Sequence, residues 1–258
     1  MPTKRTRRLW RKRAADTHPV LKWPVAALLA TMLFFALNWT YQVAKKPSEL
    51  FFPISGSLHK TPGQTWDAYA ASFREHATPI ITADFLAALA QVEASGNPLA
   101  RTYWRWSNTL NPFEVYRPAS SAVGMYQFSD GTFEEAKAYC IEDHRVVLDG
   151  PWDDPESCWF NGLYTRVLPS HSIELASAYL DVKVRDALRR HPVPGVSLRD
   201  KQELAALIHL CGAGAGRRHA RRSLGIPEGM KCGTHDLWTY LEKVRVQQTH
   251  FQKLMNAP

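Results

Sequence analysis

An uncharged stretch over residues 23–44 most constrains this chain, because few environments suit so long and apolar a segment. Its centre, Val25–Leu37, is nearly all apolar. A membrane-spanning helix needs about 20 residues of low polarity, and aromatic side chains favour its two interfaces. Trp23, Trp39 and Tyr41 stand near the two ends of the stretch. The sequence therefore predicts a transmembrane helix over these residues.

The basic leader in front of this stretch predicts its orientation. Residues 1–22 hold eight basic side chains and one acid, so they carry +7 of the chain's net charge of +8. Basic flanks of a spanning helix stay in the cytoplasm. We therefore expect a single-pass membrane protein with a cytoplasmic N-terminus and with everything after Lys45 outside the cytoplasm. In a Gram-negative cell this means the bacterial inner membrane and a periplasmic domain.

A cleaved signal peptide is the alternative interpretation of the leader. No small-x-small cleavage site follows the apolar run, so we favour an uncleaved helix. Thr6-Arg-Arg-Leu-Trp10 also loosely resembles a twin-arginine leader. Residues 23–258 carry a net charge of only +1 and show no nucleic-acid-binding signature, so we expect no nucleic-acid partner.

Four cysteines predict two disulfides in an exported chain. The favoured pairs are local in sequence, Cys140–Cys158 and Cys211–Cys232. In the chain-entropy model each would stabilise the fold by roughly 3 kcal/mol. A zinc site built from His209, Cys211, Cys232 and His235 is the alternative.

Residues 45–63 are rich in Pro, Gly and Ser, which predicts a linker. Residues 64–258 are predicted to form one mainly α domain. Apolar spacing and capping residues predict helices over these segments: 82–94 beginning at Thr82, 132–141 opened by the capping box Thr132-x-x-Glu135, 170–190, 198–211, and 234–255 beginning at Thr234.

Glu93 interrupts the amphipathic pattern, since it ends an apolar helix just before Gly96-Asn-Pro98. Burial raises the pKa of a carboxyl group, so we expect a protonated Glu93 that can donate its proton to a leaving oxygen. The plainer interpretation is a surface glutamate near a helix end.

Two further stretches bring small residues together. In residues 120–132, Gly124 permits a close approach of the backbone, Gln127 offers an amide, and Tyr126 offers a ring face for a sugar. Residues 207–216 end an apolar helix in alternating Gly and Ala. Taken singly, these stretches are a turn and a helix end.

The three stretches are the helix end from Glu93 to Pro98, residues 120–132 and residues 207–216. Taken together and in this order, they make residues 80–216 resemble the soluble lytic transglycosylase-like domain of the lysozyme superfamily, whose members cleave the glycan strands of peptidoglycan. The resemblance implies a lysozyme-like helical domain with Glu93 as the catalytic residue and with no metal or other cofactor. The partners it implies are peptidoglycan strands and, for local wall opening, a secretion or conjugation complex. The substrate-binding residues it implies are Ser95, Ser121, Gly124, Met125, Tyr126, Gln127 and Gly214.

The sequence departs from the family pattern at three places. Ala94 stands where a serine is usual, and Tyr126 replaces a methionine. Cys211-Gly212 replace a Tyr-Asn pair, so the tyrosine that contacts the catalytic glutamate is missing from its place. Tyr116, Tyr126 and His209 are the candidates for that contact.

The mechanism implied by the resemblance uses one carboxyl group twice. Glu93 would protonate the bond between MurNAc and GlcNAc and then deprotonate the MurNAc 6-hydroxyl, which gives a 1,6-anhydro product. One alternative is a lysozyme-type hydrolase with Glu114 or Asp130 as second carboxylate. Another is an inactive, membrane-tethered glycan-binding module. We expect the Trp-rich insert Tyr103–Trp106, with Arg101 and Arg105, to contact sugar rings and peptide stems, or else to pack.

Overall fold

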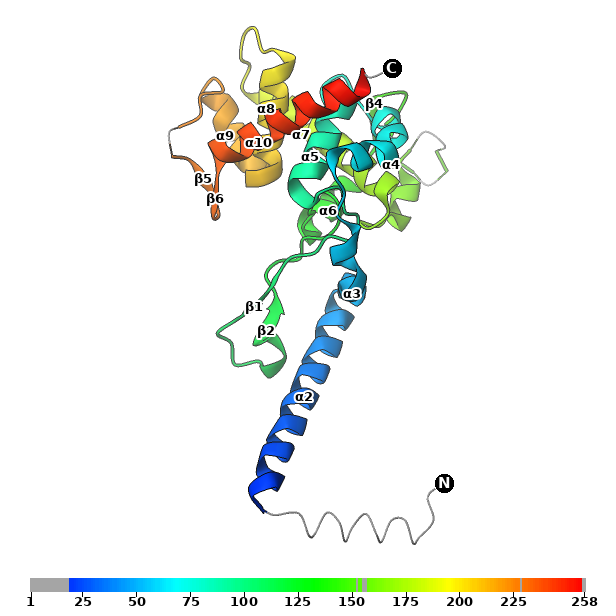
Figure 1. The fold of residues 1–258 in the computed structure, drawn as a ribbon. Helices are drawn as coiled ribbons and strands as arrows, with labels where there is room; N and C mark the ends of the chain where they lie inside the picture. Colours follow the sequence, from blue (N-terminus) through cyan, green and yellow to red (C-terminus); the bar gives the residue numbers. More distant parts are fainter. Residues whose placement is uncertain (1–18, 152, 155–156, 228, 257–258) are drawn as a thin grey trace. The chain divides into compact units, whose positions relative to one another are not determined.

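The computed structural model describes residues 19–151, 153–154, 157–227 and 229–256. The chain forms two compact units. The first unit holds the residues up to Glu49 together with Trp104–Ala119, and the second holds Leu50–Tyr103 together with Ser120 to the C-terminus. The described residues are mainly helical, with three antiparallel two-stranded sheets (Figure 1). Residues 104–119 therefore group with the N-terminal helix, and not with the rest of the expected 64–258 domain.

The first unit is built on α2 (Pro19–Lys45), and its part from Lys22 to Lys45 is long and apolar enough to cross a membrane. The basic leader falls almost wholly on residues 1–18, which lie outside the described residues. A hairpin completes the unit: β1 (Trp104–Trp106) pairs with β2 (Tyr116–Pro118), and η3 (Pro112–Glu114) lies in the loop between them.

The predicted linker over residues 45–63 is mostly helical. It contains η1 (Pro47–Phe51), α3 (Phe52–Ser55) and η2 (Gly56–Leu58), and it ends where α4 (Pro62–Glu75) begins. Thr61 caps α4: its hydroxyl accepts from the backbone N–H of Gln64 at 3.3 Å, and the Gln64 amide accepts from the N–H of Thr61 at 2.9 Å. Nothing in the sequence indicated these turns, because short turns of helix carry no periodicity to detect.

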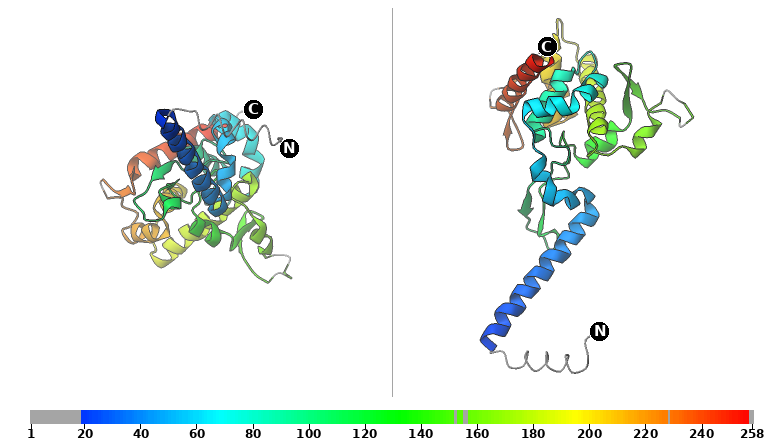
Figure 2. Two further views of the ribbon diagram at one scale, coloured as in Figure 1. Left: turned by 90° about the horizontal axis from the view of Figure 1, so that it is seen from below. Right: turned by 45° about the vertical axis from the view of Figure 1, so that its right-hand side comes forward.

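The core of the second unit is formed by its helices (Figures 1 and 2). They are α4, α5 (Ala83–Ala94), α6 (Asp130–Ala136), α7 (Pro169–Arg190), α8 (Leu198–Cys211), α9 (Ala213–Arg221) and α10 (Leu237–Met255). α10 packs against α4, α5 and α8, and α7 packs against α8 and α9. The helices predicted over 82–94, 170–190 and 198–211 are confirmed to within one residue at each end.

Two predicted helix starts were wrong. Ser129, and not Thr132, caps α6, because its hydroxyl accepts from the N–H of Thr132. Asp236, and not Thr234, caps α10, since its carboxylate accepts from the N–H of Thr239 at 2.9 Å. In both cases a better acceptor stands in the N-cap position.

Residues 139–148, which overlap the predicted helix 132–141, form a hairpin at the edge of the second unit (Figure 2). β3 (Tyr139–Glu142) pairs with β4 (Arg145–Leu148) across a turn in which Asp143 and His144 both have positive φ, 45° and 62°. Positive φ at both central residues is typical of tight hairpin turns. Outside this hairpin the unit also contains η4 (Trp159–Leu163) and a short ladder between β5 (Lys231–Cys232) and β6 (His235–Asp236).

Both predicted disulfides are confirmed. Cys140 pairs with Cys158 and Cys211 pairs with Cys232, at Cα–Cα distances of 5.5 and 5.3 Å. The second disulfide takes both thiols that the zinc alternative needs. It joins the C-terminal residue of α8 to the hairpin β5–β6, which directly precedes α10.

Candidate active site around Glu93

Glu93 lies in the last turn of α5, which is otherwise almost entirely buried. The helix ends at Ser95, whose φ of 50° is left-handed, and Gly96 follows with a φ of 64°. A Cβ on Gly96 would lie 2.2 Å from the Thr65 hydroxyl of α4, so only glycine lets the two helices approach here. This turn holds Glu93 at the edge of the core.

Two side chains from distant parts of the chain hold the Glu93 carboxylate. The Tyr240 hydroxyl of α10 donates a hydrogen bond to Glu93 Oε1 at 2.5 Å. His209 Nε2 of α8 lies 3.4 Å from the same oxygen. The Glu93 side chain is 16% exposed and that of His209 is 7% exposed. Both contacts use Oε1, so Oε2 takes part in neither.

The electrostatic surroundings of Glu93 differ from the expectation. Burial raises the pKa of Glu93, but the positive charge of His209 and hydrogen bonds from His209 and Tyr240 outweigh it. His235 of β6 adds a smaller effect in the same direction, and the net pKa lies below its ordinary value. The prediction of a carboxyl group kept protonated by burial was therefore wrong, because it left out the two partners. Burial, followed by the charge of Glu93, raises the pKa of Tyr240 well above its usual value.

His209 is one of the three candidates for the contact with Glu93. Tyr126 is not such a partner: its hydroxyl donates to the Leu86 carbonyl oxygen at 3.1 Å. Tyr116 belongs to the first unit, where its ring packs against Trp104 and Trp106. Tyr240 was missed, although it sits beside Leu241 on the apolar face of a predicted helix. A buried tyrosine needs a partner for its hydroxyl, and that was the available signal.

The second stretch folds tightly around Gly124. This residue has a φ of 84°, and a Cβ on it would lie 2.1 Å from the Arg166 carbonyl oxygen. The side-chain nitrogen of Gln127 donates to the carbonyl oxygens of Gly124, at 2.9 Å, and Ala100, at 3.2 Å. The Gln127 amide thus braces its own loop through its nitrogen.

Met125 and Tyr126 do not line a substrate surface. Both side chains are fully buried in the core. The expectation that Tyr126 presents a ring face to a sugar, and that Met125 contacts substrate, was therefore wrong. The turn that contains both residues packs into the core as a whole, since Val123 before it and Phe128 after it are buried as well.

Phe128 brings the second stretch to the site. Its ring centroid lies 6.2 Å from that of His209, the residue that contacts Glu93. Ser121, at the start of the stretch, accepts the backbone N–H of Asp130 at 3.1 Å. Ser95 is the left-handed cap of α5, and its carbonyl oxygen accepts from the N–H of Lys60 at 2.8 Å. Gly214 lies in the first turn of α9, close to the Arg218 side chain.

Each of the two candidate second carboxylates forms an ion pair. Glu114 belongs to the first unit, where it pairs with Lys45 and with Arg117. Asp130 pairs with Arg166 at 2.8 Å. The Trp-rich insert likewise lies in the first unit from Trp104 onward. Within the ranges that the structure describes, no group of three or more His, Cys, Asp or Glu side chains is placed to hold a metal ion.

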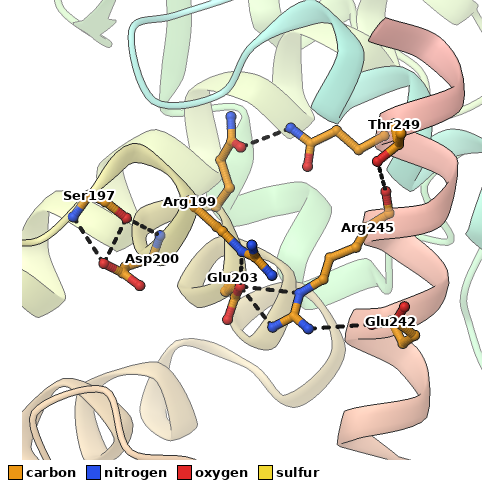
Figure 3. A network of polar contacts seen from close by, with 9 residues as sticks. Ser197, Arg199, Asp200, Glu203, Glu242, Arg245 and Thr249 are labelled. Atoms are coloured by element: carbon orange, nitrogen blue, oxygen red, sulfur yellow. Dashed lines mark hydrogen bonds and ion pairs between the residues drawn. The ribbon is translucent and has the colours of Figure 1, made fainter. Parts of the chain in front are cut away.

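A polar network fastens the helices that carry the site. Glu203 of α8 accepts from Arg245 of α10 at 2.8 Å, and also pairs with Arg199 at 3.0 Å (Figure 3). One turn further along α10, the Gln248 amide nitrogen donates to both Gln202 of α8 and Asp84 of α5, each at 2.9 Å. These bonds fix α10 against α5 and α8, and thereby fix Tyr240 against Glu93.

Comparison with known proteins adds no relative to this description: no family model, no curated protein and no solved structure matches the chain.

Proposed function

We propose that this protein is a peptidoglycan lytic transglycosylase with a lysozyme-like catalytic domain. One observation carries the proposal. The three stretches that resemble the family come together at one carboxylate, since Glu93 contacts His209 and the His209 ring packs near Phe128. The segments lie far apart in sequence, so their convergence is a property of the fold.

In the proposed reaction, protonated Glu93 donates its proton to the oxygen of the bond between MurNAc and GlcNAc. The C1–O bond breaks, GlcNAc leaves as an alcohol, and the MurNAc N-acetyl group stabilises the positive charge at C1. The Glu93 carboxylate then takes the proton of the MurNAc 6-hydroxyl, whose oxygen bonds to C1. One proton is given and one is taken back, so the residue ends as it began.

Tyr240 and His209 are positioning residues in this scheme. Both hold Oε1, so we assign the proton transfers to Oε2. Their contacts also favour the ionised form of Glu93, which is the form needed for the second step. The first step needs the protonated form, whose population grows as the pH falls. We therefore expect activity to rise toward acidic pH.

The decisive experiment compares the wild type with Glu93→Gln on purified peptidoglycan and analyses the products by mass spectrometry. We expect the wild type to release 1,6-anhydroMurNAc ends, lighter than hydrolysed ends by one water, and the variant to release none. Hydrolysed ends would instead favour a lysozyme-type hydrolase. Binding without turnover would favour an inactive glycan-binding module.

We further propose that α2 spans the bacterial inner membrane once, with the second unit in the periplasm. The length and apolarity of Lys22–Lys45 support the span. Two disulfides support an oxidising compartment. Protease digestion of spheroplasts tests the topology: the second unit should be cleaved without lysis, whereas protection until lysis would place it in the cytoplasm.

A further inference from the structure

The hairpin segment 104–119 packs along the C-terminal part of α2. The Phe35 ring meets those of Trp106 and Tyr116 edge-on, at centroid distances of 6.3 and 6.1 Å. The Tyr41 ring packs on Phe113 at 5.3 Å. These helix residues belong to the uncharged stretch 23–44. The hairpin therefore shares the solvent of that stretch, whether water or lipid.

The same segment satisfies the polar side chains of α2. Asn38 and Gln42 are 1% and 5% exposed. Both donate to the Phe113 carbonyl oxygen, at 2.9 and 2.7 Å. An amide without a partner is costly in lipid. The hairpin thus supplies the partner that these two side chains need if this end of the helix lies in a bilayer.

The hairpin also satisfies several of its own polar groups. The N–H of Ser107 donates to the Val115 carbonyl oxygen at 2.7 Å, and the N–H of Phe113 donates to the Asn111 side chain at 3.0 Å. The Glu114 carboxylate is neutralised by Lys45 and Arg117. Irregular backbone is excluded from the hydrocarbon core, so a loop with these internal bonds is suited to the headgroup region at its edge.

The outward side chains of the hairpin are those of a membrane interface. Leu110 is 103% exposed and Trp106 is 65% exposed. Phe113 is partly exposed, and the neighbouring α2 exposes Leu37 and Trp39. Arg105 is exposed on β1. Tryptophan rings and arginine side chains favour the headgroup region, where an apolar body meets a polar layer.

We propose that the segment 104–119 is a second membrane anchor, in which Leu110, Trp106 and Phe113 enter the phospholipid leaflet that surrounds the C-terminal end of α2. The proposal rests on the proposed membrane placement of α2. Phe35 lies nine residues before Ala44, about 13 Å along a helix, whereas the hydrocarbon core is about 30 Å thick. The contacts with the hairpin therefore fall within one leaflet.

A nitroxide label at Leu110→Cys tests the proposal in the full chain, reconstituted in nanodiscs of phosphatidylethanolamine and phosphatidylglycerol. All four native cysteines are in disulfides, so only the introduced thiol reacts. The Leu110 side chain is fully exposed, so its replacement removes no packing. Leu29→Cys, on an exposed position of α2, reports whether the helix itself is in lipid.

Power-saturation spectroscopy then compares the access of oxygen, which dissolves in lipid, with that of an aqueous nickel chelate. We expect the oxygen-to-nickel ratio at position 110 to exceed that of the free label several-fold and to approach that at position 29. A lipid-like ratio at 29 with a water-like ratio at 110 overturns the anchor but leaves the span intact. Water-like ratios at both positions overturn the span. A label at 110 that is shielded from both reagents overturns the lipid assignment in favour of a protein partner.

Discussion

Tyr240 donates its hydroxyl to Glu93 across 147 positions of sequence, at 2.5 Å. The bond joins the last turn of α5 to the first turn of α10, and it lies at the edge of the core. With His209 it holds the carboxylate in one orientation.

Tyr240→Phe removes the hydrogen bond and keeps the ring. The pKa of Glu93 should rise, since a donor to its ionised form is lost, and the pH–activity profile should move to higher pH. The free energy of unfolding should fall by about 1–2 kcal/mol. Tyr126→Phe is the matched control, because its hydroxyl bonds to a backbone carbonyl away from Glu93. An unmoved profile in the Tyr240 variant would argue against the positioning role.

His209→Gln replaces a side chain that can carry a positive charge by a neutral one of similar reach. The charge of His209 is the largest influence that lowers the pKa of Glu93, so the variant should raise that pKa. The fall in lysis that accompanies ionisation of Glu93 should then occur at a higher pH. Lysis of peptidoglycan at a series of pH values measures this, and a profile identical to that of the wild type would rule out an electrostatic effect of His209.

The ionisation of Glu93 should make the free energy of unfolding depend on pH in the acidic range. The folded-state pKa of Glu93 is lowered, so its ionised form adds stability at pH values above the ordinary glutamate pKa. That contribution is lost as the pH falls through the folded-state pKa. Glu93→Gln should therefore lose less stability than the wild type between neutral and acidic pH. Parallel curves of unfolding free energy against pH would contradict this.

Removing the disulfide Cys211–Cys232 should weaken both the fold and the site. Replacing both residues by serine should cost roughly 3 kcal/mol of unfolding free energy. It also frees the end of α8, two residues after His209, from the hairpin before α10. The control is the same change at Cys140 and Cys158, which should cost similar stability with little change in activity per folded molecule. Equal losses of specific activity in both variants would contradict a local role.

Gly124→Ala should destabilise the protein by roughly 1–3 kcal/mol or more. A φ of 84° is strained for alanine, and the new Cβ would meet the Arg166 carbonyl oxygen. Gly131→Ala in α6 is the control, because no atom lies within 4 Å of the new Cβ, and alanine favours a helix. Denaturant titration measures both variants. If the Gly124→Ala variant is as stable as the wild type, the loop can move away from the new methyl group.

Local signals in the sequence predicted much of the frame. The apolar stretch is a long helix, three predicted helices have the expected bounds, and both cysteine pairs are joined. Glu93 lies where the helix-ending Gly-Asn-Pro was expected to place it. Two failures are local too: Ser129 and Asp236 cap the helices in place of Thr132 and Thr234, because several neighbouring residues are suitable caps and the sequence does not fix which of them begins the helix.

By itself, then, the sequence determined the long apolar helix, the bounds of α5, α7 and α8, the disulfide pairs and the position of one carboxyl group at a helix end, since each depends on residues that are near neighbours or on a pattern with a short period. Only the tertiary structure decided that Tyr240 and His209 hold Glu93, that its pKa falls, that Tyr126 is buried, and that residues 104–119 join α2. These outcomes depend on contacts between segments far apart in the chain. No periodicity within one segment encodes which distant side chain will meet it.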